Sequence, residues 1–252
     1  MLPYKIWLET RWRFFVGMAV LLCSTAGIIY QYPRLMQLMR DMPAIQMGGE
    51  IGRRIEEALE VSRHYRGFVW SQLFQKNLAQ LGTLFAILLG TGGLLSRGGA
   101  LFTLSLPVTR RHLVAIRARV GLAQWLALAM IPPLVLPLFS PAIGETYSVV
   151  NSLAHGFCLF VVGTVFYSLA LLLSTVFSDQ WRPLLIALLV ATVMGLPAEL
   201  ASSYARYTLS GVMGGETFFR TGQLPWLGLL VSAGLSAALL YGAALNFERR
   251  DF

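Results

Sequence analysis

The sequence predicts an all-α polytopic membrane protein with six transmembrane helices, and three observations carry this prediction. Of the 252 residues, 56% are hydrophobic and only 13% are charged, which lies outside the usual composition of soluble domains. Charge-poor runs recur along the whole chain. Most approach the roughly 20 apolar residues that a helix needs to cross a bilayer, where only helices and closed barrels satisfy their backbone polar groups.

Six charge-poor runs define the expected spans of one integral membrane domain over residues 1–252. They cover residues 14–30, 77–95, 120–138, 152–177, 184–197 and 224–245. The fifth run is the shortest, and its helix is expected to begin nearer Trp181. An even number of spans places the two termini on the same side of the membrane.

The N-terminal residues 4–13 mix aromatic, aliphatic and basic side chains at helical spacing. This pattern is typical of an amphipathic helix that lies along the inner surface of the membrane. Basic residues before an apolar run also resemble a signal peptide. No convincing small-residue cleavage site follows, so the run 14–30 is expected to remain as the first span.

Basic residues in short connections indicate which side of the membrane faces the cytoplasm. They gather before the first span, between the second and third, between the fourth and fifth, and at the C-terminus: Lys5, Arg11, Arg13, Arg97, Arg110, Arg111, Arg117, Arg119, Arg182, Arg249 and Arg250. This distribution predicts an inner (cytoplasmic) cell membrane location with both termini in the cytoplasm. The outer loop 31–66 opposes it in part, because that loop holds six arginines.

The two longest outer connections carry weaker signals. The loop 31–66 contains an amphipathic pattern with Ile51, Ile55 and Leu59 on one face, as expected for a short helix. Such a helix fits an external gate or partner surface, but more often such a pattern is a solvated cap over the span ends. The second connection, residues 201–222, is glycine-rich and is expected to be less ordered.

Missing motifs remove several function classes. Neither lysine, Lys5 nor Lys76, follows the glycine-rich spacing of a phosphate-binding loop, so any nucleotide energy must come from another subunit. The sequence has no zinc-binding His-Glu-x-x-His and no Gly-x-Ser-x-Gly elbow. Cys23 and Cys158 lie inside predicted spans and indicate neither a disulfide nor a metal. We expect no enzyme activity, catalytic residue, cofactor or metal in this chain.

The net charge of +8 is spread over many connections. Attraction to anionic lipid headgroups explains such a distribution better than nucleic-acid binding does. Polar residues at membrane depth, including Asn77, Gln124 and His155, are expected to make structural hydrogen bonds more often than to line a substrate path. The small residues over 232–238 permit close helix approach, either in a seam within the subunit or in a dimer contact.

The connection between the second and third spans carries the densest functional signal. Pro107 is expected to end one short helix, and Thr109 to be the N-cap of the next. The result is a short cytosolic helix across the membrane surface that ends at two spans. Such an element can transmit a push from a soluble partner, although a plain basic loop also satisfies the topology rule.

The run Leu-Ser-Leu-Pro-Val-Thr-Arg-Arg at 104–111, preceded by Gly98, resembles the loop between spans two and three of type-2 ABC transporter permeases. Further likenesses to that family are the segment 70–78, the glycines Gly90, Gly92 and Gly93, and the tail 248–252. The chain departs from the family at Ser96 and Arg97, in the stretch where a glutamate is common, and at Gly99, where threonine is common.

The resemblance implies an export permease that pairs with a second permease subunit, as a homodimer or heterodimer. Each half would sit on a cytosolic ATP-binding cassette ATPase subunit, which would hold ATP and Mg. A coupling helix over 97–111 and a smaller contact at 178–182 are implied. The coupling residues would be Arg97, Leu104, Ser105, Leu106, Pro107, Val108, Thr109, Arg110, Arg111, Asp179, Trp181 and Arg182.

Two other classes stay open at this stage. A self-sufficient secondary transporter or channel is expected to carry charged residues at mid-membrane and internal repeats, and neither is evident in the sequence. A non-transporting membrane scaffold would not explain the short helix and turn expected at Pro107. The sequence does not indicate which substrate is moved.

Overall fold

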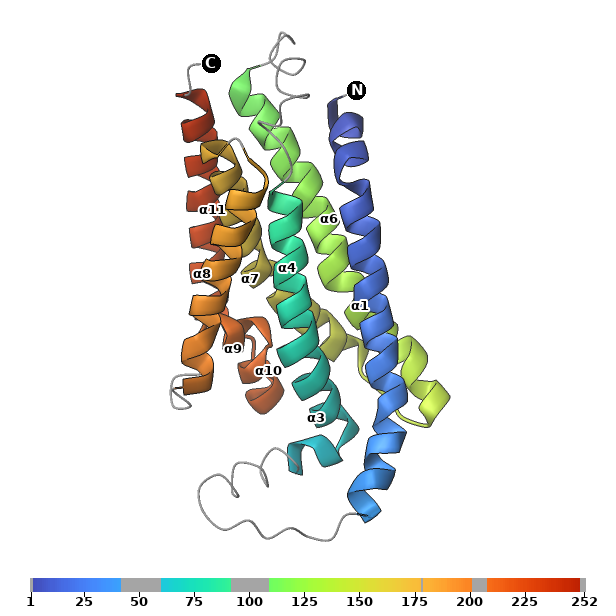
Figure 1. The fold of residues 1–252 in the computed structure, drawn as a ribbon. Helices are drawn as coiled ribbons and strands as arrows, with labels where there is room; N and C mark the ends of the chain where they lie inside the picture. The colour runs from blue at the N-terminus through green and yellow to red at the C-terminus, as the bar shows by residue number, and fades with distance from the viewer. Residues whose placement is uncertain (1, 42–59, 92–108, 178, 201–207, 250–252) are drawn as a thin grey trace.

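The computed structural model describes residues 2–41, 60–91, 109–177, 179–200 and 208–249. Every regular element in these ranges is a helix, so the described part of the chain is all-α, as the sequence predicts (Figure 1). The expected coupling helix ahead of Thr109 lies outside the described residues. So does most of the amphipathic pattern expected in the loop 31–66.

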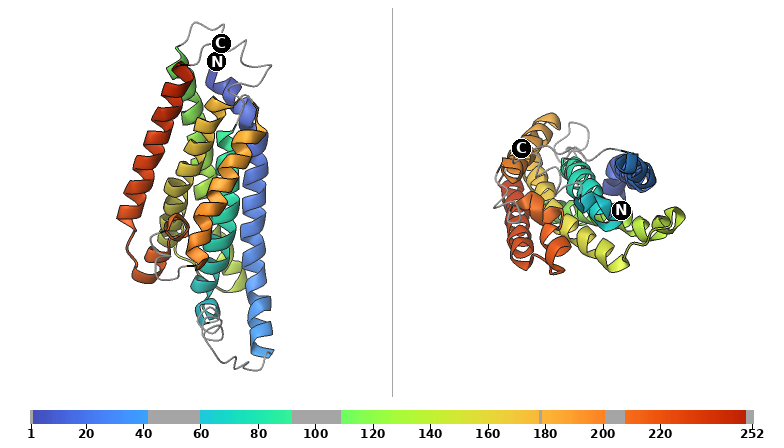
Figure 2. Two further views of the ribbon diagram at one scale, coloured as in Figure 1. Left: turned by 60° about the vertical axis from the view of Figure 1, so that its left-hand side comes forward. Right: turned by 90° about the horizontal axis from the view of Figure 1, so that it is seen from below.

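Long helices run lengthwise through one bundle, and short helices lie at one of its ends (Figures 1 and 2). The long elements are α1 (Leu2–Asp41), the consecutive segments α3 (Tyr65–Val69), η1 (Trp70–Leu78) and α4 (Ala79–Gly90), then α6 (Arg110–Phe139), α7 (Val149–Val176), α8 (Trp181–Leu200) and α11 (Trp226–Glu248). The short ones are η2 (Ser140–Ile143), α9 (Leu209–Met213) and α10 (Glu216–Thr221).

Four described helices, α1, α6, α7 and α11, are long and apolar enough to cross a membrane. Helix α8 offers a shorter apolar stretch, Trp181–Gly195. The second predicted run begins in η1 and continues through α4. The structure is therefore that of a helical protein with four candidate spans, and the six-span arrangement stays a prediction.

Helix α1 extends beyond the expected first span at both ends. Its 40 residues would measure roughly 60 Å, about twice the thickness of the hydrocarbon core. Residues 4–13 form no separate surface helix, because they continue into the span as one helix. At the other end α1 passes Gln31, where a loop was expected. Tyr32 packs there on Tyr65, with ring centroids 5.0 Å apart, and donates a hydrogen bond to the carbonyl of Arg63.

Helix α7 is central and contacts α4, α6, α8 and α11. Trp125 on α6 is fully buried, and its indole Nε1 donates a 3.0 Å hydrogen bond to the carbonyl of Phe160 on α7. Two glycines make room for this indole. A Cβ at Gly163 would collide with the ring, and one at Gly82 would lie 3.2 Å from it. Small residues thus sit where the helices approach most closely.

The small residues of α11 pack within the subunit at two positions. Ser232 and Ser236, one turn apart, are buried, and each hydroxyl donates to the carbonyl four residues earlier at 2.8 Å. Because α11 packs most extensively on α7, this face fits the seam interpretation. Gly234 lies on another face, with open space where a Cβ would be.

Residues 208–222, expected to be less ordered, instead form α9 and α10 and dock on the bundle. The indole Nε1 of Trp70 donates a 3.0 Å hydrogen bond to the carbonyl of Gly214, and its ring stacks on Phe219 at 4.4 Å. Gly215 joins the two helices with a φ of +66°, a conformation that favours glycine. Gly215 also lets the turn pass close to His155, because an added Cβ would lie 2.9 Å from the ring.

Candidate functional site

The described residues of the two segments expected to meet a partner, from Thr109 and from Asp179 onward, lie at one end of the bundle, which we call the basic end and define by Leu2, Thr109, Asp179 and Glu248. Helix α1 begins there, α6 and α8 begin there, and α11 ends there (Figures 1 and 2). Both ends of the described chain therefore share one end of the bundle. The short helices α3, α9 and α10 lie at the opposite end.

Thr109 marks the start of α6, as predicted. Its backbone is extended, with φ −62° and ψ 141°, but its side chain makes no capping hydrogen bond. Arg110 is the first residue of the helix. The remaining residues of the expected coupling helix lie outside the described residues: Arg97, Leu104, Ser105, Leu106, Pro107 and Val108.

Arg111 forms an ion pair with Glu248, which joins the start of α6 to the end of α11. The arginine side chain is 62% exposed and the glutamate 34%, so solvent screens the pair and it contributes little to stability. The pair still fixes the position of the basic side chain. It also gives Glu248 a structural partner.

The second expected contact is an exposed turn ahead of α8. Asp179 and Arg182 form an ion pair of 3.3 Å, three residues apart. Trp181 between them is 73% exposed. An indole with this much free surface suits the membrane interface or a protein partner, because one edge can stay in water while the ring is covered.

Arg13 connects this turn to two helices. Its Nη1 donates a 2.8 Å hydrogen bond to the carbonyl of Leu88, near the end of α4, and its Nη2 lies 3.4 Å from Oε1 of Gln180. One side chain of α1 thus touches both α4 and the residues that open α8. Although Arg13 was expected to belong to the basic cluster, this bridging role was not predicted.

Arg117 on α6 was expected to belong to the basic cluster on the cytoplasmic side, but its burial was not predicted. It is only 5% exposed, and its one ionic partner in the described structure is Glu9, with Nη1 and the carboxylate oxygen 3.9 Å apart. Arg117 shares a helical face with Gly121 and Gln124, at spacings of four and seven, and that face turns out to be buried.

Three polar residues that were expected to be structural do make hydrogen bonds. The side-chain amide of Asn77 donates a 3.0 Å hydrogen bond from Nδ2 to the carbonyl of Gln72, in the π-helical segment η1. Gln124 donates a 2.8 Å hydrogen bond from Nε2 to the hydroxyl of Thr10 on α1. Nδ1 of His155 lies 2.8 Å from the carbonyl four residues earlier, so Nδ1 carries the proton.

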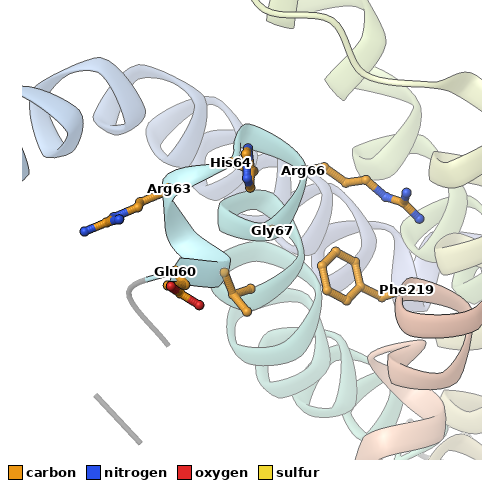
Figure 3. Close-up of a pocket in the computed structure, with 7 residues that line it drawn as sticks. Glu60, Arg63, His64, Arg66, Gly67 and Phe219 are labelled. Carbon is orange, nitrogen blue, oxygen red and sulfur yellow. The ribbon is translucent and has the colours of Figure 1, made fainter. Parts of the chain in front are cut away.

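The opposite end contains a cavity of about 640 Å³. Its lining residues come from the α3 region and α10: Glu60, Val61, Arg63, His64, Arg66, Gly67 and Phe219 (Figure 3). The guanidinium of Arg66 lies over the Phe219 ring, 5.4 Å from its centroid. Figure 3 shows Arg63 pointing away from Phe219, so the basic groups do not converge on one point.

Near the start of α7, three side-chain polar atoms are buried without a partner. They are the Tyr147 hydroxyl, the Ser152 hydroxyl and Nε2 of His155. The His155 ring stacks on Phe74 at 4.3 Å, and burial raises the pKa of Tyr147 above its ordinary range. Such atoms usually mark sites of ordered water.

No group of three or more His, Cys, Asp or Glu residues that could hold a metal occurs among the described residues. Among known protein families, curated proteins and solved structures, none matches this chain. The arrangement of residues at the two ends of the bundle is therefore the basis for inferring function.

Proposed function

We propose that this chain is the membrane-spanning permease subunit of an ABC transporter, with six spans, and that it works in export. Two permease subunits would form the translocation pathway. Each would sit on a cytosolic ATPase subunit that binds and hydrolyses ATP with Mg. The basic end would then face the cytoplasm, with both termini.

One observation carries the proposal: the described residues of the two segments expected to meet the ATPase, Thr109 to Arg111 and Asp179 to Arg182, lie at the same end of the bundle (Figure 1). Thr109 and Arg111 open α6 there, and Asp179 to Arg182 open α8. A single soluble partner could therefore contact both segments at once. The side chains of Arg111, Trp181 and Arg182 are exposed at this end and available for such a contact.

The connections at the basic end suit the transmission of movement. Arg13 ties the turn before α8 to α1 and α4, so a displacement of that turn would act on two more helices. The permease dimer would exchange between an inward-open and a closed arrangement. Nucleotide binding would favour one of them only if the nucleotide-bound ATPase pair binds that arrangement more tightly than the other.

A secondary transporter has less support. Such proteins place charged residues at mid-membrane. In the described part of the candidate spans, the buried charged side chain is Arg117, which precedes the apolar run 120–138.

Co-purification with a candidate ATP-binding cassette subunit from the same organism tests the docking site. The double variant Arg110→Glu/Arg111→Glu is expected to recover less ATPase, or to lose transport-coupled ATP turnover, while it still inserts in the membrane. Glu248→Gln is the matched control, because it breaks the Arg111 ion pair without reversing the basic surface. Unchanged recovery and turnover in the double variant would contradict docking here.

Cysteine labelling tests the orientation. In a background without Cys23 and Cys158, the variant Arg182→Cys is expected to react with an impermeant reagent only after the cells are permeabilised. Arg220→Cys, which replaces an exposed residue at the opposite end, should react in intact cells. The reverse pattern would overturn the proposal.

A further inference from the structure

The guanidinium of Arg117 is buried, but the described residues around it do not supply acceptors for all of its N–H groups. Its side chain is 6% exposed, and its Nε is buried without a hydrogen-bond partner. The nearest acid, Glu9, stands 3.9 Å from Nη1, which is longer than a hydrogen bond. A guanidinium offers five N–H donors, so this side chain could bind an acceptor that the described chain does not supply.

A buried charge without close partners is strongly unfavourable, and such groups are normally paired. Glu9 compensates Arg117 only weakly, because its side chain is 42% exposed and therefore well solvated. Tyr167 also favours the charged form of Arg117, but its hydroxyl donates a 3.3 Å hydrogen bond to the backbone carbonyl of Arg117 and not to the guanidinium. Arg13 opposes that charge and adds a second positive charge to the same region between α1 and α6. An anionic oxygen ligand would satisfy this region.

The level of Arg117 along the bundle indicates which anion is available. The apolar run of α1 begins at residue 14 and that of α6 at residue 120. Placing both runs in the hydrocarbon core puts Arg13 and Arg117 just outside it, at the depth of the lipid phosphates. Beside Glu9, the exposed face of α1 continues with Trp12 and Val16, an apolar surface that acyl chains would cover.

We propose that Arg117 binds the phosphate of an acidic membrane lipid, whose headgroup enters between α1 and α6 at the basic end. The planar guanidinium forms paired hydrogen bonds with phosphate oxygens, and basic pockets between membrane helices recognise such headgroups. The site depends on insertion in a bilayer and not on the transporter assignment. It would remain if the chain proved to have no ATPase partner.

Thermal unfolding of the full chain in detergent tests the site, with phosphatidylglycerol, phosphatidylcholine or inorganic phosphate added in separate series. Phosphatidylglycerol is expected to raise the unfolding temperature of the wild type. Arg117→Gln should need about tenfold more of this lipid for the same rise, since charge-assisted hydrogen bonds are lost. Arg119→Gln is the matched control: it removes the same charge from an exposed position two residues on, and should behave as wild type.

Two further variants keep the test decisive if Arg117→Gln does not fold. Arg117→Lys retains the charge without the planar fork, and is expected to bind the lipid more weakly. Glu9→Gln removes the competing carboxylate and should bind at least as tightly as the wild type. An equal loss of response in the Arg117 and Arg119 variants would overturn the proposal, and so would a loss in Glu9→Gln. Stabilisation by inorganic phosphate alone would overturn the assignment to a lipid.

Discussion

The guanidinium of Arg13 donates a 2.8 Å hydrogen bond from α1 to the carbonyl of Leu88, two residues before α4 ends. The last carbonyls of a helix have no partner within it, and positive charges near them are favourable. The same side chain lies 3.4 Å from the amide oxygen of Gln180. Arg13 thus fixes three separate parts of the basic end.

Replacing Arg13 is expected to loosen this end. Arg13→Gln should lower the free energy of unfolding by about 1–2 kcal/mol, because the half-buried carbonyl of Leu88 loses a charged donor and keeps only the 3.2 Å hydrogen bond from the Thr91 hydroxyl. Thermal unfolding in detergent measures the change. Arg11→Gln removes an equal charge from an exposed position on the same helix, and should stay within about 0.5 kcal/mol of the wild type. Equal effects of the two variants would show that the bridge contributes nothing.

Trp70 is expected to hold α9 and α10 against the bundle. It combines the hydrogen bond to Gly214 with the stack on Phe219, so Trp70→Phe should lose the first contact and keep much of the second. We expect faster amide hydrogen exchange over residues 208–222 in Trp70→Phe, and a larger increase in Trp70→Ala.

Trp226→Phe provides the control for that experiment, because Trp226 is 62% exposed. Its exchange over residues 208–222 should match that of the wild type. Unchanged exchange in Trp70→Ala would show that other contacts, such as Phe218 against His155, are sufficient to hold these helices.

The helical class and the positions of the long helices follow from the sequence because apolar runs are a strong signal. Each of the six predicted runs lies within or overlaps a described helix. The extension of α1 to Asp41 could not be predicted from hydropathy. Arg34 and Gln31 are polar, and the helix continues through contacts with residues distant in the chain, such as Tyr32 with Tyr65.

The sequence predicted that two basic segments lie on one side of the membrane, but not which residues they contact. The basic clusters of the sequence at Arg111 and Arg182 do lie at one end of the bundle. Their partners, Glu248 for one and Asp179 for the other, depend on helix packing and on local turn geometry. Burial of Arg117 depends on which face of α6 meets α1, and a charged residue carries no hydropathy signal for burial.

Gly163 tests the packing of the central helix. A Cβ at this position would collide with the fully buried Trp125 ring, which cannot move away without breaking its hydrogen bond to Phe160. Gly163→Ala should therefore lower the free energy of unfolding by about 1–3 kcal/mol, the usual cost of overpacking. Trp125→Phe shortens the ring, so the double variant should lose less stability than the sum of the two single losses.

Gly27→Ala is the control, since nothing lies within 4 Å of its added Cβ. It should be neutral or stabilising by up to about 1 kcal/mol. Thermal unfolding of the four variants measures these differences, and a simple sum in the double variant would show that the glycine and the indole do not interact.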